Sequence, residues 1–215
     1  MTPAAPSPTQ PVTLPQRRRF SLAEYHQLME LGILTEADRV ELIHGDLMQM
    51  VAKGTAHASC NTRLLRALIP LVGDRAIVRS QEPLSLSTPT PKGSTVPNAE
   101  SEPEPDCALV RPQADAYSTA HPTAEAVLLV IEIAQSSLEY DRTVKLALYA
   151  AAGLPDYWLF NLPERRLETY ADPYVTAQGT WTYRRQQTYP APAIVPLPGD
   201  LALDLDLGQV FPPAL

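Results

Sequence analysis

Apolar residues recur at helical spacing in three segments of the chain and at strand spacing in several others. The pattern predicts helices that begin at Ser21, Thr55 and Ser136. It predicts strands over 39–50, 76–78, 84–87, 126–134, 156–160, 166–170, 181–189 and 201–205, with a turn at His44-Gly45-Asp46 that divides the first of these ranges in two.

The predicted helices carry recognisable start and stop signals. Ser21-Leu22-Ala23-Glu24 has the spacing of a capping box, and so has Ser136-Ser137-Leu138-Glu139. Gly32 and Gly153 are expected to end the first and third helices, since glycine adopts the left-handed conformation that closes a helix. The second helix is expected to end at or before Pro70, because proline interrupts the helical hydrogen bonds.

One carboxylate interrupts the most apolar strand. The segment 126–134 is apolar except at Glu132, as expected for a central strand covered on both faces. An ionised carboxylate there is costly unless a cation or metal ion pairs with it. Asp106 heads a second apolar stretch, Cys107-Ala108-Leu109-Val110, and Lys145 follows on the third helix. Two acids and a lysine brought together in this way are the parts of a magnesium-dependent site that cleaves phosphodiester bonds.

The order of the elements indicates a single α/β (α+β) domain. Residues 1–16 hold five prolines without periodicity and are expected to form a disordered leader before a domain over 17–215. The core of that domain is expected at about 19–170, with a β extension over 171–215. Between Thr88 and Pro105 the chain predicts a long functional or disordered loop that leads directly into Asp106.

Charge and cysteine content narrow the function classes. The net charge of −7 and pI near 5.1 count against general affinity for DNA, although Arg17-Arg18-Arg19 and Arg184-Arg185 are local basic patches. Cys60 and Cys107 are far apart in the sequence and are expected to be free thiols in a reducing compartment. With no apolar run of membrane length and no signal-peptide core, a cytoplasmic location is expected.

The order of several motifs resembles the PD-(D/E)XK nuclease superfamily, and more closely the Uma-type family of restriction-endonuclease-like proteins. The matching stretches lie between about Arg19 and Tyr170 and are Phe20–Tyr25, Val40–Leu47, His57, Glu104-Pro105-Asp106, Glu132–Ser137, Asp141 with Lys145, and Tyr149–Trp158. The resemblance implies a restriction-endonuclease-like fold, a central mixed β-sheet flanked by helices. It also implies an endonuclease that acts on phosphodiester bonds, with DNA as the expected substrate.

The resemblance assigns roles to individual residues. Asp106 and Glu132 would bind Mg²⁺, with Mn²⁺ as an alternative, and Glu41 would add a third carboxylate directly or through water. Lys145 would orient the attacking hydroxide or stabilise the transition state. The superfamily places its lysine two residues after the second acid, but position 134 is alanine. The family resembled takes that lysine from the following helix, which corresponds to Lys145.

Two further residues are candidates for contact with substrate. His57 stands at the start of the second predicted helix, and Ser136 caps the third, where a helix N-terminus can hold a phosphate oxygen. Nucleases that cut both strands commonly act as dimers, so a homodimer is expected, with the C-terminal strands as its candidate interface.

Structural alternatives remain open for each residue. Asp106 could open a turn, Glu132 could pair with Arg142, and Glu41 could face solvent. Lys145 could form a surface pair with Asp141, four residues earlier. A Cys60–His57 nucleophile is rejected because Cys60 lies on the apolar face and no orienting acid is evident. No zinc-hydrolase motif is present.

Two rival functions follow from the same residues. The acidic charge and the alanine at position 134 favour a catalytically inactive nuclease-fold scaffold that binds nucleic acid or a protein partner. A metal-dependent hydrolase of RNA or of a small phosphodiester is also compatible with the sequence. If Asp106, Glu132 and Lys145 converge, the enzyme is favoured, whereas a solvent-facing Lys145 favours the scaffold.

Overall fold

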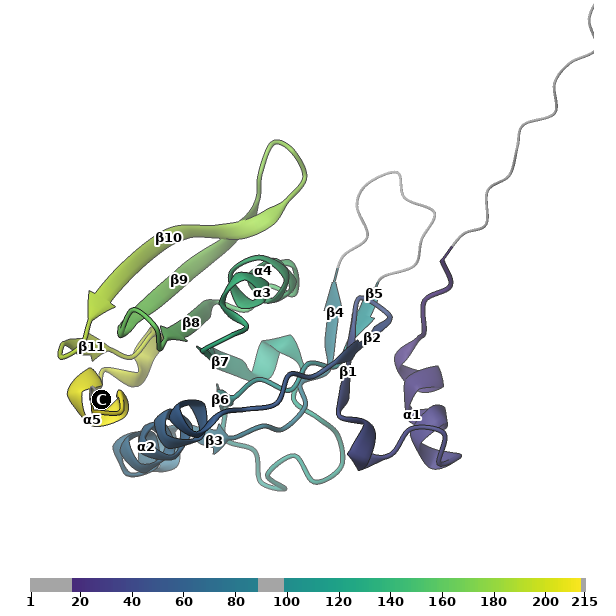
Figure 1. Ribbon diagram of the computed structural model, residues 1–215, viewed down its shortest axis with the longest axis horizontal. Helices are drawn as coiled ribbons and strands as arrows, with labels where there is room; N and C mark the ends of the chain where they lie inside the picture. The colour runs from purple at the N-terminus through teal and green to yellow at the C-terminus, as the bar shows by residue number, and fades with distance from the viewer. Residues whose placement is uncertain (1–16, 89–98, 214–215) are drawn as a thin grey trace, which may run out of the picture.

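The computed structural model describes residues 17–88 and 99–213. The predicted leader, 1–16, and most of the loop predicted after Thr88 lie outside these ranges. Figure 1 shows a central twisted sheet with helices on both faces. This confirms the predicted mixed α/β architecture.

Six strands form the central sheet in the order β10-β9-β8-β7-β6-β3. The pair β7–β8 is parallel and its neighbours are antiparallel, so the sheet is mixed. The six strands are β3 (Ile77–Arg79), β6 (Cys107–Val110), β7 (Val127–Ala134), β8 (Asp156–Asn161), β9 (Arg166–Val175) and β10 (Trp181–Pro190).

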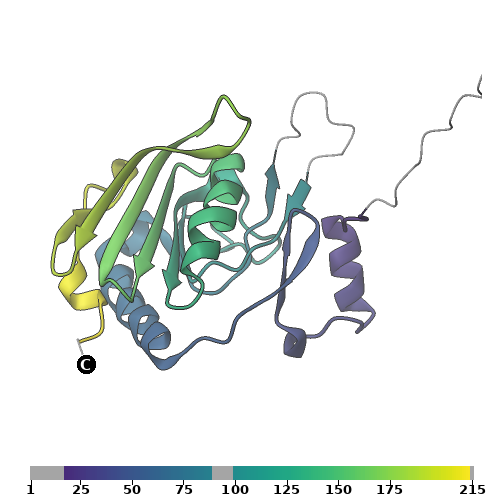
Figure 2. The same cartoon turned by 45° about the horizontal axis from the view of Figure 1, so that its top comes forward.

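Helices cover both faces of this sheet, as Figure 2 shows from a second direction. One face packs against α2 (Thr55–Val72), and its core includes Leu64, Leu68, Ile131 and Phe160. The other packs against the continuous helical segment formed by α3 (Leu138–Tyr140), a π-helical turn (Asp141–Lys145) and α4 (Leu146–Ala151). Its core includes Val130, Leu148, Tyr149 and Leu159. Alternate residues of β7 therefore face opposite cores, with Glu132 on the α4 side.

Smaller elements lie beside the sheet. They are α1 (Leu22–Glu30), β1 (Val40–Ile43), β2 (Asp46–Gln49), β4 (Leu86–Thr88), β5 (Ala99–Ser101), β11 (Ile194–Pro196), β12 (Asp204–Asp206) and α5 (Leu207–Val210). Short 3₁₀ turns occupy Glu36–Asp38, Gly73–Arg75, Ala124–Ala126 and Gly199–Leu201. Within the described ranges, no helix has the length and apolarity needed to cross a membrane.

Three local predictions were wrong. Helix α2 continues past Pro70 to Val72, because only its final turn is affected and the Gly73 N–H closes it on the Ile69 carbonyl. Ser137 makes no capping bond at the start of α3, since its hydroxyl donates to Asp141 instead. Residues 99–101, expected within a loop, form β5 by pairing with β4. The capping box predicted from Ser21 to Glu24 is present.

Candidate active site

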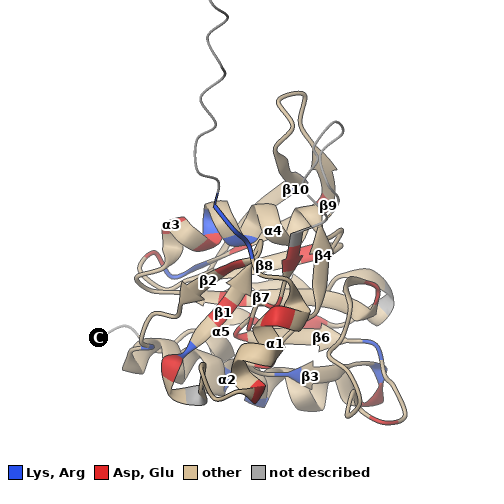
Figure 3. Cartoon of the chain, turned by 90° about the vertical axis from the view of Figure 1, so that its right-hand side faces the viewer, with Lys and Arg blue, Asp and Glu red and all other residues tan. Residues whose placement is uncertain are grey.

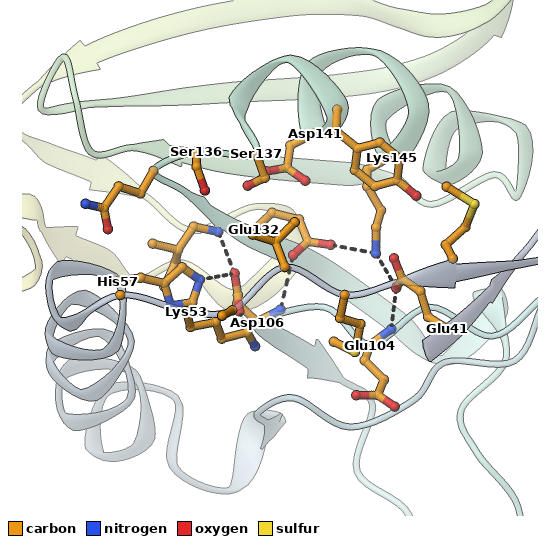
Figure 4. A pocket seen from close by; sticks show the side chains of 18 of the residues that line it. Glu41, Lys53, His57, Glu104, Asp106, Glu132, Ser136, Ser137, Asp141 and Lys145 are labelled. Atoms are coloured by element: carbon orange, nitrogen blue, oxygen red, sulfur yellow. Dashed lines mark hydrogen bonds and ion pairs between the residues drawn. The ribbon is translucent and has the colours of Figure 1, made fainter. Parts of the chain in front are cut away.

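A pocket of about 340 Å³ opens between the linker 50–54, the start of α2 and the helical segment after β7. Charged side chains from elements far apart in the sequence line it, as Figure 4 shows. The carboxylates are Glu41, Glu104, Asp106, Glu132 and Asp141, and the cations are Lys53 and Lys145.

Asp106 and Glu132 lie next to each other because their strands pair. In the antiparallel β6–β7 register Cys107 opposes Ile131, so the residue before Cys107 lies beside Glu132. The Asp106 backbone N–H donates to Glu132 Oε2 at 3.3 Å, and the Ile133 N–H donates to Asp106 Oδ2 at 2.8 Å. Two hydrogen bonds from backbone N–H groups to carboxylate oxygens thus hold Asp106 and Glu132 together, just before β6 begins and near the end of β7.

Glu132 is buried and hydrogen-bonded on the α4 side of β7. Burial raises the pKa of Glu132 to about 8, although the charge of Lys145 works in the opposite direction. The Tyr149 hydroxyl donates to Oε1 at 2.6 Å, and Lys145 Nζ lies 3.4 Å from the same oxygen. Arg142, the alternative partner, pairs with Glu168 and Glu164 and makes no ion pair with Glu132 within the described residues.

Lys145 points into the pocket and not to solvent. Its Nζ lies 2.6 Å from Glu41 Oε2, and the same oxygen accepts the Glu104 backbone N–H at 3.2 Å. Burial alone would lower the pKa of Lys145, but the Glu132 and Glu41 carboxylates raise it above its ordinary value. Lys145 is therefore a buried ammonium held between two acids.

The π-helical turn explains why the surface pair of Asp141 and Lys145 was a wrong alternative. Both side chains are buried within this turn. Asp141 accepts a hydrogen bond of 2.6 Å from the Ser137 hydroxyl, and burial raises the pKa of Asp141 to about 6. A widened turn of this kind is common at functional sites because it re-aims side chains without ending the helix.

Asp106 has two further partners in the pocket. His57 Nε2 lies 2.9 Å from Asp106 Oδ2, and Lys53 Nζ lies 2.9 Å from Oδ1. Although burial opposes ionisation, the hydrogen bond and charge of His57, followed by Lys53, hold the pKa of Asp106 below its ordinary value. Asp106 is therefore ionised beside a more readily protonated Glu132.

The two residues predicted to contact substrate occupy different positions. His57 is buried and contacts Asp106, while Ser136 is exposed at the rim of the pocket. Cys60 is fully buried in the α2 core, and burial raises the pKa of its thiol to about 12. The expectation that His57 lacks an orienting acid was wrong, since Asp106 contacts it, but the buried, protonated thiol supports the rejection of a Cys60–His57 nucleophile.

The donor set suits a hard divalent cation. Within the described ranges, no three His, Cys, Asp or Glu side chains are placed to hold a metal ion together. Mg²⁺, however, keeps several waters and is usually bound by one or two carboxylates together with substrate phosphate. Asp106 and Glu132 provide two carboxylates on adjacent strands, and Glu41 is the closer of the two acids that Lys145 contacts, at 2.6 Å against 3.4 Å for Glu132. The residues therefore fit such an ion through two direct protein ligands.

Sequence reasoning missed two polar partners in this pocket. Lys53 lies in an irregular linker, where no periodicity marks an inward side chain. Tyr149 is a fully buried core residue, and its hydroxyl donates a hydrogen bond to Glu132. A buried tyrosine hydroxyl needs a hydrogen-bond partner, which is the signal that would have linked Tyr149 to a buried acid.

Comparisons with known proteins agree with this architecture. Among solved structures, a crystal structure described as "a putative nuclease belonging to DUF820 from Anabaena variabilis" superposes with a TM-score of 0.61 at 18% identity. The match covers 86% of this chain and 96% of that one, and at this identity it shows the fold. No curated protein matches the chain significantly.

A family model identifies the chain more directly. The model of the family Uma2, described as "Putative restriction endonuclease", matches residues 22–208. This range includes the pocket residues from Glu41 to Lys145 and all six strands of the central sheet. The chain belongs to the Uma2 family of restriction-endonuclease-like proteins.

Proposed function

We propose that this chain is a metal-dependent endonuclease that hydrolyses phosphodiester bonds in DNA. The observation that carries the proposal is the convergence of Asp106, Glu132 and the buried ammonium of Lys145 on one pocket. A scaffold without chemistry has no need for a buried cluster of ionisable groups, which is costly to fold.

Asp106 and Glu132 are the proposed metal ligands, with Glu41 acting through water. Restriction-endonuclease-like nucleases generally use divalent metal ions, and Mg²⁺ is the ion proposed here, with Mn²⁺ as a substitute. When bound, the ion would lower the pKa of a water ligand and neutralise charge on the scissile phosphate.

The residues of the chain have separate tasks in this proposal. Lys145, fixed by Glu41 and Glu132, offers a positive charge to the phosphate oxygens as charge builds up in the transition state. Tyr149 orients Oε1 of Glu132 by its hydrogen bond. His57 orients Asp106 through Oδ2. Ser136, on the rim, is the remaining candidate for substrate contact.

The acidic charge of the chain shapes the expected interaction with DNA. Figure 3 shows acidic positions near β1, β7 and β8 in this view, with a basic stretch where the described chain begins. Such a surface repels a polyanion unless cations intervene. DNA affinity is therefore expected to depend on divalent ions as well as on local arginines.

The organisation of the chain is part of the proposal. We infer one domain over 17–215, which the family match over 22–208 supports. A homodimer built on the C-terminal strands would bring two pockets to one duplex. β10 stands at one edge of the central sheet and is the candidate contact.

Cleavage of supercoiled plasmid tests the proposal. Wild type should nick the plasmid with Mg²⁺ or Mn²⁺ and lose this activity in EDTA. Asp106→Asn, Glu132→Gln and Lys145→Met should each lower the rate by at least about 100-fold, the scale of losing one charge-stabilising group. Asp156→Asn is the matched control, since this partly buried acid at the start of β8 does not line the pocket.

The outcomes separate the enzyme from its rivals. A folded wild type that neither cleaves DNA nor binds Mn²⁺ by calorimetry would favour the inactive scaffold. Cleavage of RNA but not DNA under the same conditions would correct the substrate. Activity that survives all three pocket substitutions would assign the chemistry to another site.

A further inference from the structure

The two oxygens of Asp106 have partners that differ in number and burial. Oδ2 accepts the backbone N–H of Ile133 at 2.8 Å and lies 2.9 Å from Nε2 of His57, whose side chain is 8% exposed. Oδ1 contacts Lys53 Nζ at 2.9 Å. Oδ2 is thus held by the sheet and a buried ring, and Oδ1 by a single long side chain.

Lys53 is the more exposed of the two pocket lysines. Its side chain is 20% exposed, against 6% for Lys145, and it belongs to the linker between β2 and α2. Among the described residues, Asp106 is its one ion-pair partner, whereas Lys145 contacts both Glu41 and Glu132.

The backbone beside Lys53 lies against the side chain of Gln135. The next residue, Gly54, passes so close to Gln135 that an added Cβ would lie 3.1 Å from Gln135 Oε1. This contact places the linker against the loop that follows β7, at the mouth of the pocket. Because the lysine stem is flexible, rotation of the side chain is enough to move Nζ of Lys53 away from Asp106 Oδ1.

We propose that Lys53 is an exchangeable counter-ion and a substrate-binding residue. It neutralises Asp106 in the metal-free protein, leaves Oδ1 when a divalent ion binds there, and then contacts a non-bridging phosphate oxygen of the DNA. The inference rests on the proposed function, which it extends by naming the oxygen that binds metal and the cation that meets substrate.

The exchange follows from the geometry of Asp106. A divalent ion on Oδ1 would repel the ammonium group that now lies 2.9 Å from it, and Oδ2 is already held by two donors. The displaced ammonium stays tethered at the pocket mouth, where the phosphate backbone of a substrate must enter. Lysine suits this role because its flexible stem carries a compact charge that can reach either group.

Manganese binding is the first test, measured by calorimetry on wild type, Lys53→Met and Arg66→Met. Lys53→Met keeps the side-chain length but removes the competing cation. It should bind Mn²⁺ roughly tenfold more tightly, the scale of one charge-assisted hydrogen bond. Arg66→Met, an exposed position of α2 outside the pocket, makes the same change in net charge and should leave the affinity within about twofold of wild type.

DNA binding should change in the opposite direction. The probe is a fluorescent 20-base-pair duplex in Ca²⁺, which takes the same oxygen ligands as Mg²⁺. Lys53→Met should weaken binding several-fold and reduce the slope of log K against log salt by about 0.9, the value for one lost phosphate contact. Lys53→Arg keeps the charge and should retain the wild-type slope.

Each outcome decides the inference. Equal Mn²⁺ affinity of wild type and Lys53→Met, or an unchanged salt slope, would overturn it while leaving the proposed nuclease intact. No Mn²⁺ binding by either protein would overturn the proposed function and this inference together. Lys53→Arg, with a thermal melt of each variant, separates the loss of charge from a loss of folding.

Discussion

The hydroxyl of Tyr149 donates a hydrogen bond of 2.6 Å to Oε1 of Glu132, between α4 and β7. This bond favours the ionised carboxylate, whereas burial favours the protonated one and raises the pKa of Glu132 to about 8. Tyr149 therefore affects the pH at which Glu132 ionises and can act as the proposed metal ligand.

Tyr149→Phe should shift the pH dependence of metal binding upward. Without the hydroxyl the pKa of Glu132 rises further, so a higher pH is needed to remove its proton. At pH 7 we expect roughly tenfold weaker Mn²⁺ binding, about the value of one hydrogen bond to a charged group. Calorimetric titration of Mn²⁺ from pH 6 to 9 measures this change in affinity. Tyr157→Phe is the control, since the Tyr157 hydroxyl donates to the Asp141 backbone carbonyl and not to Glu132. An unshifted pH profile in Tyr149→Phe would contradict the prediction.

Glu132→Gln should stabilise the metal-free protein at alkaline pH. The pKa of Glu132 is raised from its ordinary value of 4.5 to about 8 in the folded state. Its protonation therefore contributes stability that is complete below pH 4.5 and is lost as pH rises through 8. Glutamine resembles the protonated form and should avoid this loss.

Urea unfolding in EDTA at pH 5 and pH 9 measures the effect. At pH 9 we expect the free energy of unfolding of Glu132→Gln to exceed that of wild type by at least about 1 kcal/mol. The difference should be smaller at pH 5. A variant less stable than wild type at pH 9 would show that the ion pair with Lys145 outweighs the cost of burial. The same substitution should abolish cleavage, so stability and activity would oppose each other at this position.

Glu168→Gln should destabilise the protein most at neutral pH. Burial opposes ionisation of Glu168, but hydrogen bonds from Arg142, Asn161, Tyr170 and Arg166 hold its pKa at about 2. Since that pKa lies below the ordinary 4.5, its stabilising effect is present above pH 4.5 and is lost as pH falls through 2.

Chemical denaturation from pH 7 to pH 2 tests this acid dependence. At pH 7 we expect Glu168→Gln to lower the free energy of unfolding by about 3 kcal/mol, because the Arg142 guanidinium would lose a buried partner. The difference from wild type should shrink toward pH 2. Glu164→Gln is a useful control, since that acid belongs to the same cluster but is 47% exposed. A difference that is constant with pH would contradict the assignment.

Gly45→Ala should cost more stability than Gly179→Ala. Both glycines have positive φ, 80° and 84°, so alanine is strained at either position by about 1–2 kcal/mol. At Gly45 a Cβ would also lie 2.7 Å from Arg19 Cβ and 2.9 Å from the Phe20 carbonyl oxygen, whereas nothing lies within 4 Å at Gly179.

Thermal unfolding of the two variants distinguishes the cost of backbone strain from the added cost of a steric clash. We expect the free energy of unfolding to fall by about 1 kcal/mol in Gly179→Ala and by at least about 2 kcal/mol in Gly45→Ala, since overpacking adds to the strain. Equal costs would mean that the chain at Arg19 moves aside freely. Gly45 also belongs to the turn after β1, the strand that carries Glu41, so Gly45→Ala should reduce cleavage as well.

Part of the site could be predicted because its residues interrupt strong patterns. Glu132 is conspicuous as the single acid in the apolar run of β7. Asp106 comes directly before a short apolar stretch, and pairing of β6 with β7 brings the two acids together. Lys145 follows Glu132 on the next predicted helix, and the resemblance to restriction-endonuclease-like proteins added Glu41, which no periodicity links to these strands.

Other features depend on tertiary structure and left no local signal. The π-helical turn changes the face on which Lys145 lies, so an i,i+4 pair with Asp141 was a reasonable but wrong alternative. Pro70 is tolerated because it occupies the last turn of α2, where packing of Leu68 and Val72 outweighs one lost hydrogen bond. Strand β5 forms by pairing with β4, which ends at Thr88, and the Gly45 N–H after β1 donates to the Glu100 carbonyl.

The contact between Lys145 and Glu41 joins residues that are 104 positions apart. During synthesis Glu41 leaves the ribosome long before Lys145 has been added, and Asp106 and Glu132 emerge between them. The pocket therefore cannot be complete before Lys145 has been added, and it also depends on strands that follow Lys145. A chain that stops before Lys145 lacks the ammonium group proposed to act on the phosphate, even though it already carries Glu41, Asp106 and Glu132.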